Sequence, residues 1–169
     1  MTDAPQSPFH VEAMREDDVP AVAALGDPNG TPDARESNLR TELGRSWARC
    51  WVAREADGRA AAFLVAWHVA DELHVLDLAT RIDRRRRGMG RALLEGALAY
   101  ARANRVRQVL LEVRRSNVPA IALYRAVGFF AAGIRAGYYP DAEDAIEMSL
   151  VLEPATGAIL VHPDRVRLD

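Results

Sequence analysis

Apolar and polar residues alternate along several short stretches of the chain, and this pattern predicts β-strands. The clearest stretch is VRQVLLEV, in which three aliphatic residues share one side of an extended backbone and Glu112 falls on the other. The strand-like stretches are residues 9–14, 48–55, 61–70, 73–80, 106–113, 129–135 and 145–153. An Asp57-Gly58 pair favours a tight turn, so residues 48–80 are expected to form a three-stranded meander.

Two later stretches have helical spacing instead. Leucine and alanine residues recur every three or four positions from Gly90 to about Asn104, which predicts a helix with one apolar face. In SNVPAIALYRAVGFF, Asn117 can cap a short helix, Pro119 fits its first turn and Gly128 follows its last turn. A strand is expected to enter each of these helices.

The first third of the chain predicts two further helices. REDDVPAVAAL has Asp17 or Asp18 available as an N-cap. At the end of the turn-rich residues 26–33, Thr31 followed by Pro32 can open a second helix that runs through about Arg45. The expected order is β-α-α-β-β-β-α-β-α-β-β. It predicts an α/β (α+β) fold, with a mixed, mostly antiparallel sheet of about seven strands and helices on both faces.

Composition narrows the function classes. The 169 residues suffice for one domain with its own core, and the formal net charge of −2 argues against a protein that binds polyanions with its whole surface. Cys50 is the only cysteine, which excludes an internal disulfide and a zinc site of the finger type. The N-terminus lacks a secretory pattern and no stretch is long enough to cross a bilayer, so we expect a soluble cytoplasmic protein with no membrane partner.

All 22 basic residues are arginine. A Walker-type phosphate loop and Schiff-base chemistry both need lysine, so both are excluded. The run RRRRGMGRALL still places two glycines and a helix start directly after a strand, where free backbone N–H groups and the helix dipole suit a phosphate. Two alternatives stay open at this point: a plain helix start after a tight turn, and an arginine patch that binds nucleic acid.

Residues Arg85–Gly90, RRRGMG, resemble the pyrophosphate-binding signature of the GNAT superfamily of acyl-CoA-dependent N-acetyltransferases, which is Arg or Gln, two variable residues, Gly, one variable residue, then Gly or Ala. The resemblance continues through LHVLDLAT, LLEVRRSNVPAIALYRAVGFF and GYYPDAEDAIEMSLVLE, and is strongest to the ribosomal-protein-alanine N-acetyltransferases (RimI-like). It implies a GNAT fold in a single acetyltransferase domain at 9–153, between a flexible N-terminus at 1–8 and a C-terminal extension at 154–169. Residues 26–37, GDPNGTPDARES, lack the Pro-Trp element of that subfamily. This region helps to shape the acceptor groove in the family, so the difference leaves the identity of the acceptor open.

The same resemblance implies acetyl-CoA as cosubstrate and no metal. The end of a strand would meet the pantetheine arm, the basic loop and helix start would cradle the pyrophosphate, and Asn117 would lie beside the pantetheine. The implied cosubstrate residues are Leu78, Ala79, Thr80, Arg85, Arg86, Arg87, Gly88, Met89, Gly90, Arg91, Asn117 and Tyr124. Three interpretations stay open for Arg84 and Arg87: their side chains are solvated, they bind the 3′-phosphate of CoA, or they bind an acidic partner.

For catalysis, the resemblance implies that Glu112 is the general base and Tyr124 the general acid for the leaving thiolate. Asp77, Tyr138 and Tyr139 would border the acceptor amine. The expected acceptor is the N-terminal α-amine of a protein or peptide, with a ribosomal protein as the candidate, and direct contact with nucleic acid is not expected.

Each of these residues has a structural alternative. Glu112 could face solvent or pair with an arginine such as Arg114, Tyr124 could be an ordinary half-buried helix tyrosine, and the tyrosines at 138–139 could only cover the core. Asp77 could merely cap a bend in its strand.

The sequence also leaves other functions open for the protein. Acetylation of a polyamine, an aminoglycoside or a lysine side chain is the alternative enzyme activity. A non-catalytic acyl-CoA-binding module and an RNA or ribosome binder are the alternatives outside enzymes. His68 and His74 lie on expected strands without a carboxylate cluster, which favours structural roles over metal ligation, and Cys50 is expected to be an inert core residue.

Overall fold

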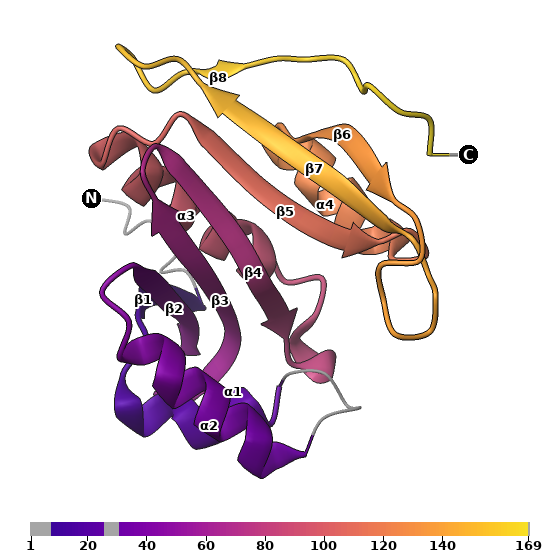
Figure 1. Ribbon diagram of the computed structural model, residues 1–169. Helices are drawn as coiled ribbons and strands as arrows, with labels where there is room; N and C mark the ends of the chain where they lie inside the picture. The colour runs from indigo at the N-terminus through magenta and orange to yellow at the C-terminus, as the bar shows by residue number, and fades with distance from the viewer. Residues whose placement is uncertain (1–7, 26–30, 169) are drawn as a thin grey trace. The chain divides into compact units, whose positions relative to one another are not determined.

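A computed structural model describes residues 8–25 and 31–168, and Figure 1 shows their arrangement. The strands are β1 Phe9–Ala13, β2 Ala48–Glu55, β3 Ala60–Val69, β4 Glu72–Thr80, β5 Gln108–Arg114, β6 Phe130–Arg135, β7 Ala145–Leu152 and β8 Ile159–Leu160. The helices are η1 Glu16–Asp18, α1 Val19–Ala23, α2 Pro32–Leu43, η2 Ile82–Arg84, α3 Met89–Ala103 and α4 Val118–Val127. The expected order is therefore confirmed, and β8 adds an eighth strand. Of the turn-rich segment expected at 26–33, residues 26–30 lie outside the described residues, as do residues 1–7 of the expected flexible N-terminus.

The strands form a mixed sheet in the order β1-β2-β3-β4-β5-β7-β6, with β8 paired to β7. The pair β4·β5 is parallel, whereas β1·β2, β5·β7, β6·β7 and β7·β8 are antiparallel. This arrangement confirms the mixed, mostly antiparallel sheet. No helix among the described residues is both long and apolar enough to span a membrane.

The residues divide into two compact units, and each is described by itself. Unit 1 comprises residues up to Ala66 together with Asp77–Gly96, and unit 2 comprises Trp67–Leu76 with the residues from Ala97 onward. This division does not test the expected domain bounds, which remain a prediction.

Helices cover both faces of the strands in unit 1. Figure 1 shows α1 and α2 in front of these strands and α3 behind them. The front face encloses a hydrophobic core of Met14, Val19, Val22, Ala23, Leu39, Val52, Ala60, Phe63 and Val65. On the back face α3 packs so tightly that a Cβ on Gly96 would lie 3.3 Å from Cγ1 of Val11. The expectation of helices on both faces is confirmed.

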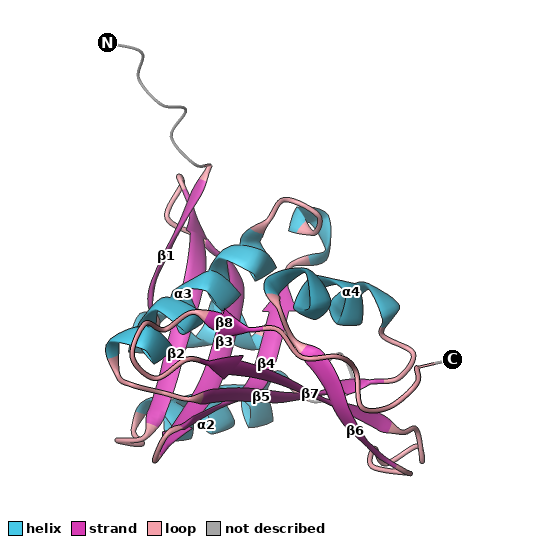
Figure 2. Ribbon diagram, turned by 90° about the horizontal axis from the view of Figure 1, so that it is seen from above, coloured by secondary structure: helices cyan, strands magenta, loops and turns pink. Residues whose placement is uncertain are grey.

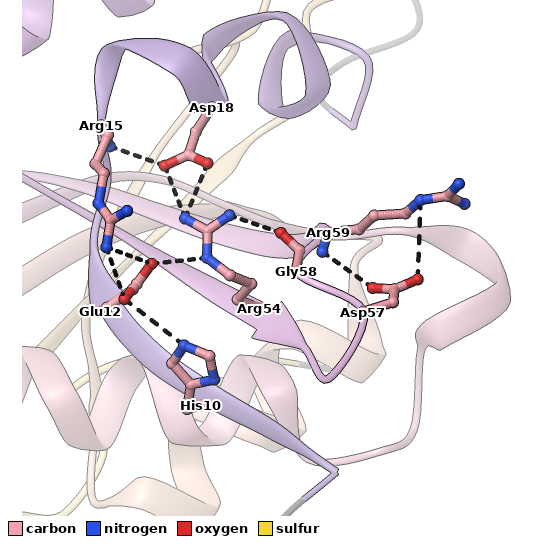
Figure 3. Close-up of polar contacts among 8 residues, drawn as sticks. All are labelled: His10, Glu12, Arg15, Asp18, Arg54, Asp57, Gly58 and Arg59. Carbon is pink, nitrogen blue, oxygen red and sulfur yellow. Dashed lines mark hydrogen bonds and ion pairs between the residues drawn. The ribbon is translucent and has the colours of Figure 1, made fainter.

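Asp18 is the N-cap residue of α1, one of the two positions expected from the sequence, but its side chain makes no cap hydrogen bond to that helix. Its carboxylate accepts the Arg15 backbone N–H at 2.8 Å and pairs with Arg54 of β2 at 2.9 Å, while Arg54 Nε also donates to Glu12 of β1 at 2.7 Å. Figure 3 shows Arg54 between the two carboxylates. The Asp18 carboxylate thus joins the backbone before η1 to Arg54 of β2, and does not bond to a backbone N–H of α1.

The caps expected for two other helices are confirmed. Thr31 Oγ1 accepts the backbone N–H of Ala34, and Asn117 Oδ1 accepts that of Ala120, each at 3.3 Å. Gly128 ends α4 with a φ of 120°, a conformation that residues with a Cβ rarely adopt. Figure 2 shows α4 on one face of the β5, β7 and β6 strands of unit 2.

Candidate active site

The basic loop after β4 has the backbone of a phosphate cradle. We call residues 85–90 the phosphate loop. Within it Arg86 and Gly88 take φ angles of 63° and 84°, and α3 begins at Met89. A Cβ on Gly88 would meet no atom within 4 Å, so the main chain at this position is open to an approaching group. The first backbone N–H groups of a helix have no partner within the helix, and here they follow directly on this open turn.

The charges around the phosphate loop suit an anion. Arg85, Arg86 and Arg87 are exposed, and the Nε of Arg85 donates to the carbonyl oxygen of Thr80 at 3.3 Å. Arg91 forms an ion pair with Glu95 at 2.8 Å, but both side chains are more than half exposed, and such a pair adds little to stability. The residues present thus fit a pyrophosphate group, which three exposed guanidinium groups and a helix N-terminus would bind together.

Arg84 has a structural role that separates it from this group. Its guanidinium donates to Glu55 at the end of β2 and pairs with Asp83 at 2.9 Å. Arg81 uses the same two carboxylates, with distances of 2.9 Å to Glu55 and 2.6 Å to Asp83, and the hydrogen bond from Arg81 lowers the pKa of Asp83. The carboxylates of Glu55 and Asp83 thus neutralise Arg81 and Arg84 within unit 1.

The end of β4 carries the residues expected to meet the pantetheine arm. The β4·β5 ladder runs from the pair Glu72–Gln108 to the pair Val75–Leu111. Beyond it come Leu78, Ala79 and Thr80, all half-buried, whereas Asp77 is exposed. These four residues lie in unit 1 together with the phosphate loop.

In unit 2, Glu112 lies on the exposed face of β5 with a partner for each carboxylate oxygen. Its Oε1 pairs with Nη1 of Arg135 at 2.9 Å, and its Oε2 accepts the Tyr138 hydroxyl at 2.8 Å. The alternative pairing with Arg114 is wrong, because Arg114 binds Asp141 and Glu143 instead. Glu112 thus combines an ion pair with a neutral hydrogen bond.

The Tyr138 phenol remains a hydrogen-bond donor at neutral pH. The hydrogen bond to Glu112, followed by the charge of that carboxylate, raises the pKa of Tyr138. Its ring meets that of Tyr139 edge to face, with centroids 5.2 Å apart. The two tyrosines expected at the acceptor therefore lie together, and one of them contacts the expected base.

Arg114 holds the loop that carries these tyrosines. Its guanidinium lies 4.0 Å above the ring of Tyr139 and pairs with Asp141 and Glu143, each at 2.9 Å. The Glu143 carboxylate also accepts the backbone N–H of Ser116 at 2.8 Å. Burial raises the pKa of Tyr139. The loop between β6 and β7 is thereby fastened to the end of β5.

Asn117 is the N-cap residue of α4, and Tyr124 lies further along the same helix. Asn117 is exposed at the N-terminus, where its side chain caps the helix. The Tyr124 side chain is buried, and its ring centroid is 5.8 Å from that of Phe129. These placements leave both expected roles, beside the pantetheine and at the sulfur, as predictions.

The remaining candidates have local partners. Nδ1 of His68 lies 2.8 Å from the Tyr100 hydroxyl, and Nε2 of His74 lies 2.7 Å from Glu72. Burial raises the pKa of the Cys50 thiol to about 11, which keeps it a protonated neighbour of the unit 1 core. Within 8–25 and 31–168, no three His, Cys, Asp or Glu side chains are grouped so that they could hold a metal ion.

Two residues at the Glu112 cluster escaped the sequence reasoning. Arg135 binds both Glu112 and Glu147, which lie opposite each other on β5 and β7. The available signal was strand alternation, since Glu147 is a lone acid among apolar residues in AIEMSLVL. Arg135 is the last residue of β6, and an exposed arginine is common at such a position, so its sequence context gave no sign of a role.

With this fold and these residues in place, the class of protein is that of the acetyltransferases. Residues 11–129 match the Acetyltransferase (GNAT) family, and the chain belongs to this family.

Particular relatives narrow the comparison. The chain is similar to the ribosomal protein bS18-alanine N-acetyltransferase of Salmonella typhimurium, with 47% identity over 98 residues that cover 56% of this chain and 66% of the relative. The matched segment thus spans just under two thirds of that relative. A putative protein of the same description from Bacillus subtilis is 30% identical over 82% of this chain and 92% of its own length. In structure, the chain is similar to the ribosomal-protein-S18-alanine N-acetyltransferase of Escherichia coli, with a TM-score of 0.73, 32% identity and coverage of 83% of this chain and 92% of the other.

Proposed function

We propose that the protein transfers an acetyl group from acetyl-CoA to the N-terminal α-amine of a protein, with a ribosomal protein as the candidate acceptor. The observation that carries the proposal is the Glu112 carboxylate on the exposed face of β5, held by Arg135 and Tyr138, in a chain of the GNAT family. The similarity to ribosomal protein bS18-alanine N-acetyltransferases supports the choice of acceptor. A ribosomal acceptor also implies that the reaction takes place in the cytoplasm.

The chain's residues take the following parts in the transfer. The amine nitrogen attacks the thioester carbonyl carbon, so a C–N bond forms as the C–S bond breaks. Glu112 accepts the proton that the amine loses, and the Tyr124 hydroxyl donates a proton to the departing thiolate. A main-chain N–H near Ala79 donates to the oxyanion. Proton exchange with solvent then restores Glu112 and Tyr124.

The acceptor's own pKa explains why a carboxylate can serve as the base. An α-amine with a pKa of about 7.8 is roughly 15% neutral at pH 7, a cost of about 1.2 kcal/mol, whereas a lysine amine near 10.4 costs about 4.6 kcal/mol. An N-terminal acceptor therefore asks little of Glu112. Lysine side chains are the less favoured alternative for this reason.

The cosubstrate would be held by the residues expected from the sequence. Members of the GNAT family use acetyl-CoA. The phosphate loop, with Arg91, would bind the pyrophosphate, and main-chain groups of Leu78, Ala79 and Thr80 would bind the pantetheine arm. Asn117 would lie beside that arm, and Asp77 with the tyrosines at 138–139 would border the acceptor. Arg87 is available for the 3′-phosphate.

A peptide panel tests the acceptor. The purified chain is incubated with acetyl-CoA and short peptides that differ in their first residue, including one that begins with alanine, and the products are identified by mass spectrometry. We expect one added acetyl group on the α-amine. Controls are the same peptide with a blocked N-terminus and an internal lysine, and free spermidine. Acetylated spermidine without any peptide product would overturn the proposal in favour of a small-amine acetyltransferase.

A further inference from the structure

Two carboxylates lie directly opposite each other in unit 2. The β5·β7 register pairs Glu112 with Glu147, so their side chains leave the same face of the sheet. Like charges in such a position repel each other. Arg135 of β6 removes this repulsion, because Nη1 lies 2.9 Å from Glu112 and Nε 2.7 Å from Glu147. The hydrogen bond to Glu147, followed by the Glu112 charge, raises the pKa of Arg135.

A β-bulge brings Arg135 to this face. The β6·β7 pairing shifts register between Ala131, opposite Met148, and Gly133, opposite Glu147. In an unshifted ladder Gly133 would lie opposite the buried Ile146, and Arg135 would share that residue's side of the sheet. One extra residue therefore moves the arginine to the side of the two carboxylates, as bulges near functional sites often do.

Gly133 makes room for the second carboxylate. A Cβ at this position would lie 2.4 Å from Oε2 of Glu147, too close for any real contact. Oε2 of Glu147 thus occupies the space beside Gly133 while its Oε1 pairs with Arg135. Bulge, glycine and carboxylate together fix where the guanidinium lies.

From this arrangement we propose that Arg135, anchored by Glu147, is a positioning residue that aims the Glu112 carboxylate at the acceptor amine. Arg135 holds Oε1 and Tyr138 holds Oε2, so the carboxylate plane cannot turn freely. With two carboxylates and one guanidinium the cluster has a formal charge of −1, which suits an incoming ammonium group. This inference rests on the proposed function, in which Glu112 is the base.

A double-mutant cycle on turnover tests the role. Arg135→Met removes the charge but keeps the length of the stem, and Glu112→Gln removes the base. We expect Arg135→Met to lower kcat for the acceptor peptide at least about tenfold, since small misplacements of a catalytic group have costs of this order. In the Glu112→Gln background the same change is expected to alter kcat less than about twofold, because Arg135 acts through Glu112.

Three further variants make the test specific. Arg135→Lys keeps a cation and is expected to recover part of kcat, and Glu147→Gln is expected to lower kcat in the same direction as Arg135→Met. Arg125→Met is the matched control, since Arg125 is an exposed arginine of α4 that pairs with Asp164. Its kcat should match that of the unaltered protein. Thermal unfolding and the KM for acetyl-CoA show whether any variant has lost structure instead.

The possible results separate the two proposals. An equal loss from Arg135→Met in both backgrounds, or no loss, overturns the positioning role while leaving the acetyl transfer intact. Turnover that survives Glu112→Gln overturns both the base and the positioning role. A protein that acetylates no N-terminal peptide, but acetylates spermidine with the same dependence on Arg135, overturns the proposed acceptor alone.

Discussion

At the scale of single residues, the site depends on which partner each charged or phenolic group finds. Glu112 and Tyr138 form a hydrogen bond of 2.8 Å, while Tyr124 is buried on α4 against Phe129. The two tyrosines thus have different environments. Tyr138 contacts the carboxylate proposed as the base, whereas the role of Tyr124 as general acid remains a prediction that substitution of its hydroxyl can test.

We expect Tyr124→Phe to lower turnover at least about tenfold with little change in the affinity for acetyl-CoA, because it deletes only the hydroxyl that we propose as the proton donor to the thiolate. Steady-state kinetics give kcat, and isothermal titration gives the affinity. Tyr100→Phe is the control, since that hydroxyl binds His68 in the same unit. Equal rates for Tyr124→Phe and the unaltered protein would remove the general-acid role.

At the scale of elements, the sequence patterns were good guides to helices and strands. The strand 48–55 has the expected bounds, and α3 buries the expected stripe of Leu93, Leu94, Ala97, Leu98 and Ala101. The Asn117 and Gly128 signals bracket α4 as expected. Such signals act over a few residues, so the sequence alone carries them. The β6 bulge was not expected, because its position depends on pairing with β7.

Two turns that each contain a glycine with nearly the same φ provide a test of the phosphate loop. Gly88 and Gly58 have φ angles of 84° and 85°, and an added Cβ would meet nothing within 4 Å at either position. Alanine at either position should lower the free energy of unfolding by roughly 1–2 kcal/mol, because a residue with a Cβ is strained at a positive φ. Only Gly88→Ala should also weaken acetyl-CoA binding, by at least about tenfold, since the methyl group occupies the space that the pyrophosphate needs.

Thermal unfolding and calorimetric titration with acetyl-CoA measure the two effects separately. Equal affinities for Gly88→Ala and Gly58→Ala would show that the turn after β4 is only a helix start.

At the scale of the whole molecule, ion pairs join segments that are remote in sequence. The composition gives the number of charged residues, but it does not say which of them pair. Arginine supplies every basic side chain, and several of these arginines join two carboxylates from different elements. Hydrogen bonds from Arg54, Arg81 and Arg114 lower the pKa of Glu12, Asp83 and Asp141, respectively. The paired carboxylates therefore make stability depend on pH.

A carboxylate whose pKa is lower in the folded state stabilises the fold above its unfolded pKa, and this contribution is lost as pH falls through the folded pKa. The ordinary pKa of the Glu12 side chain is 4.5, so the contribution of Glu12 to the stability of the folded state should decline below about pH 4.5. The Glu12→Gln variant should have a lower free energy of unfolding than the unaltered protein at pH 7. It should also lose less of that free energy when the pH is lowered. Urea unfolding at pH 7 and pH 3 measures this, with Glu36→Gln, from the exposed pair Glu36–Arg40, as control. An unchanged acid dependence in Glu12→Gln would exclude the Arg54 cluster as a cause.

The sequence by itself determined the order of helices and strands, the face of β5 that carries Glu112, and the glycine turn before α3, because periodicity, caps and turn chemistry act between near neighbours. Only the tertiary structure decided which arginine meets which acid. Arg84 binds Glu55, 29 residues away, and Arg135, which no local pattern distinguished, reaches Glu112 through a bulge. All arginines have the same chemistry, so the folded chain alone selects their partners.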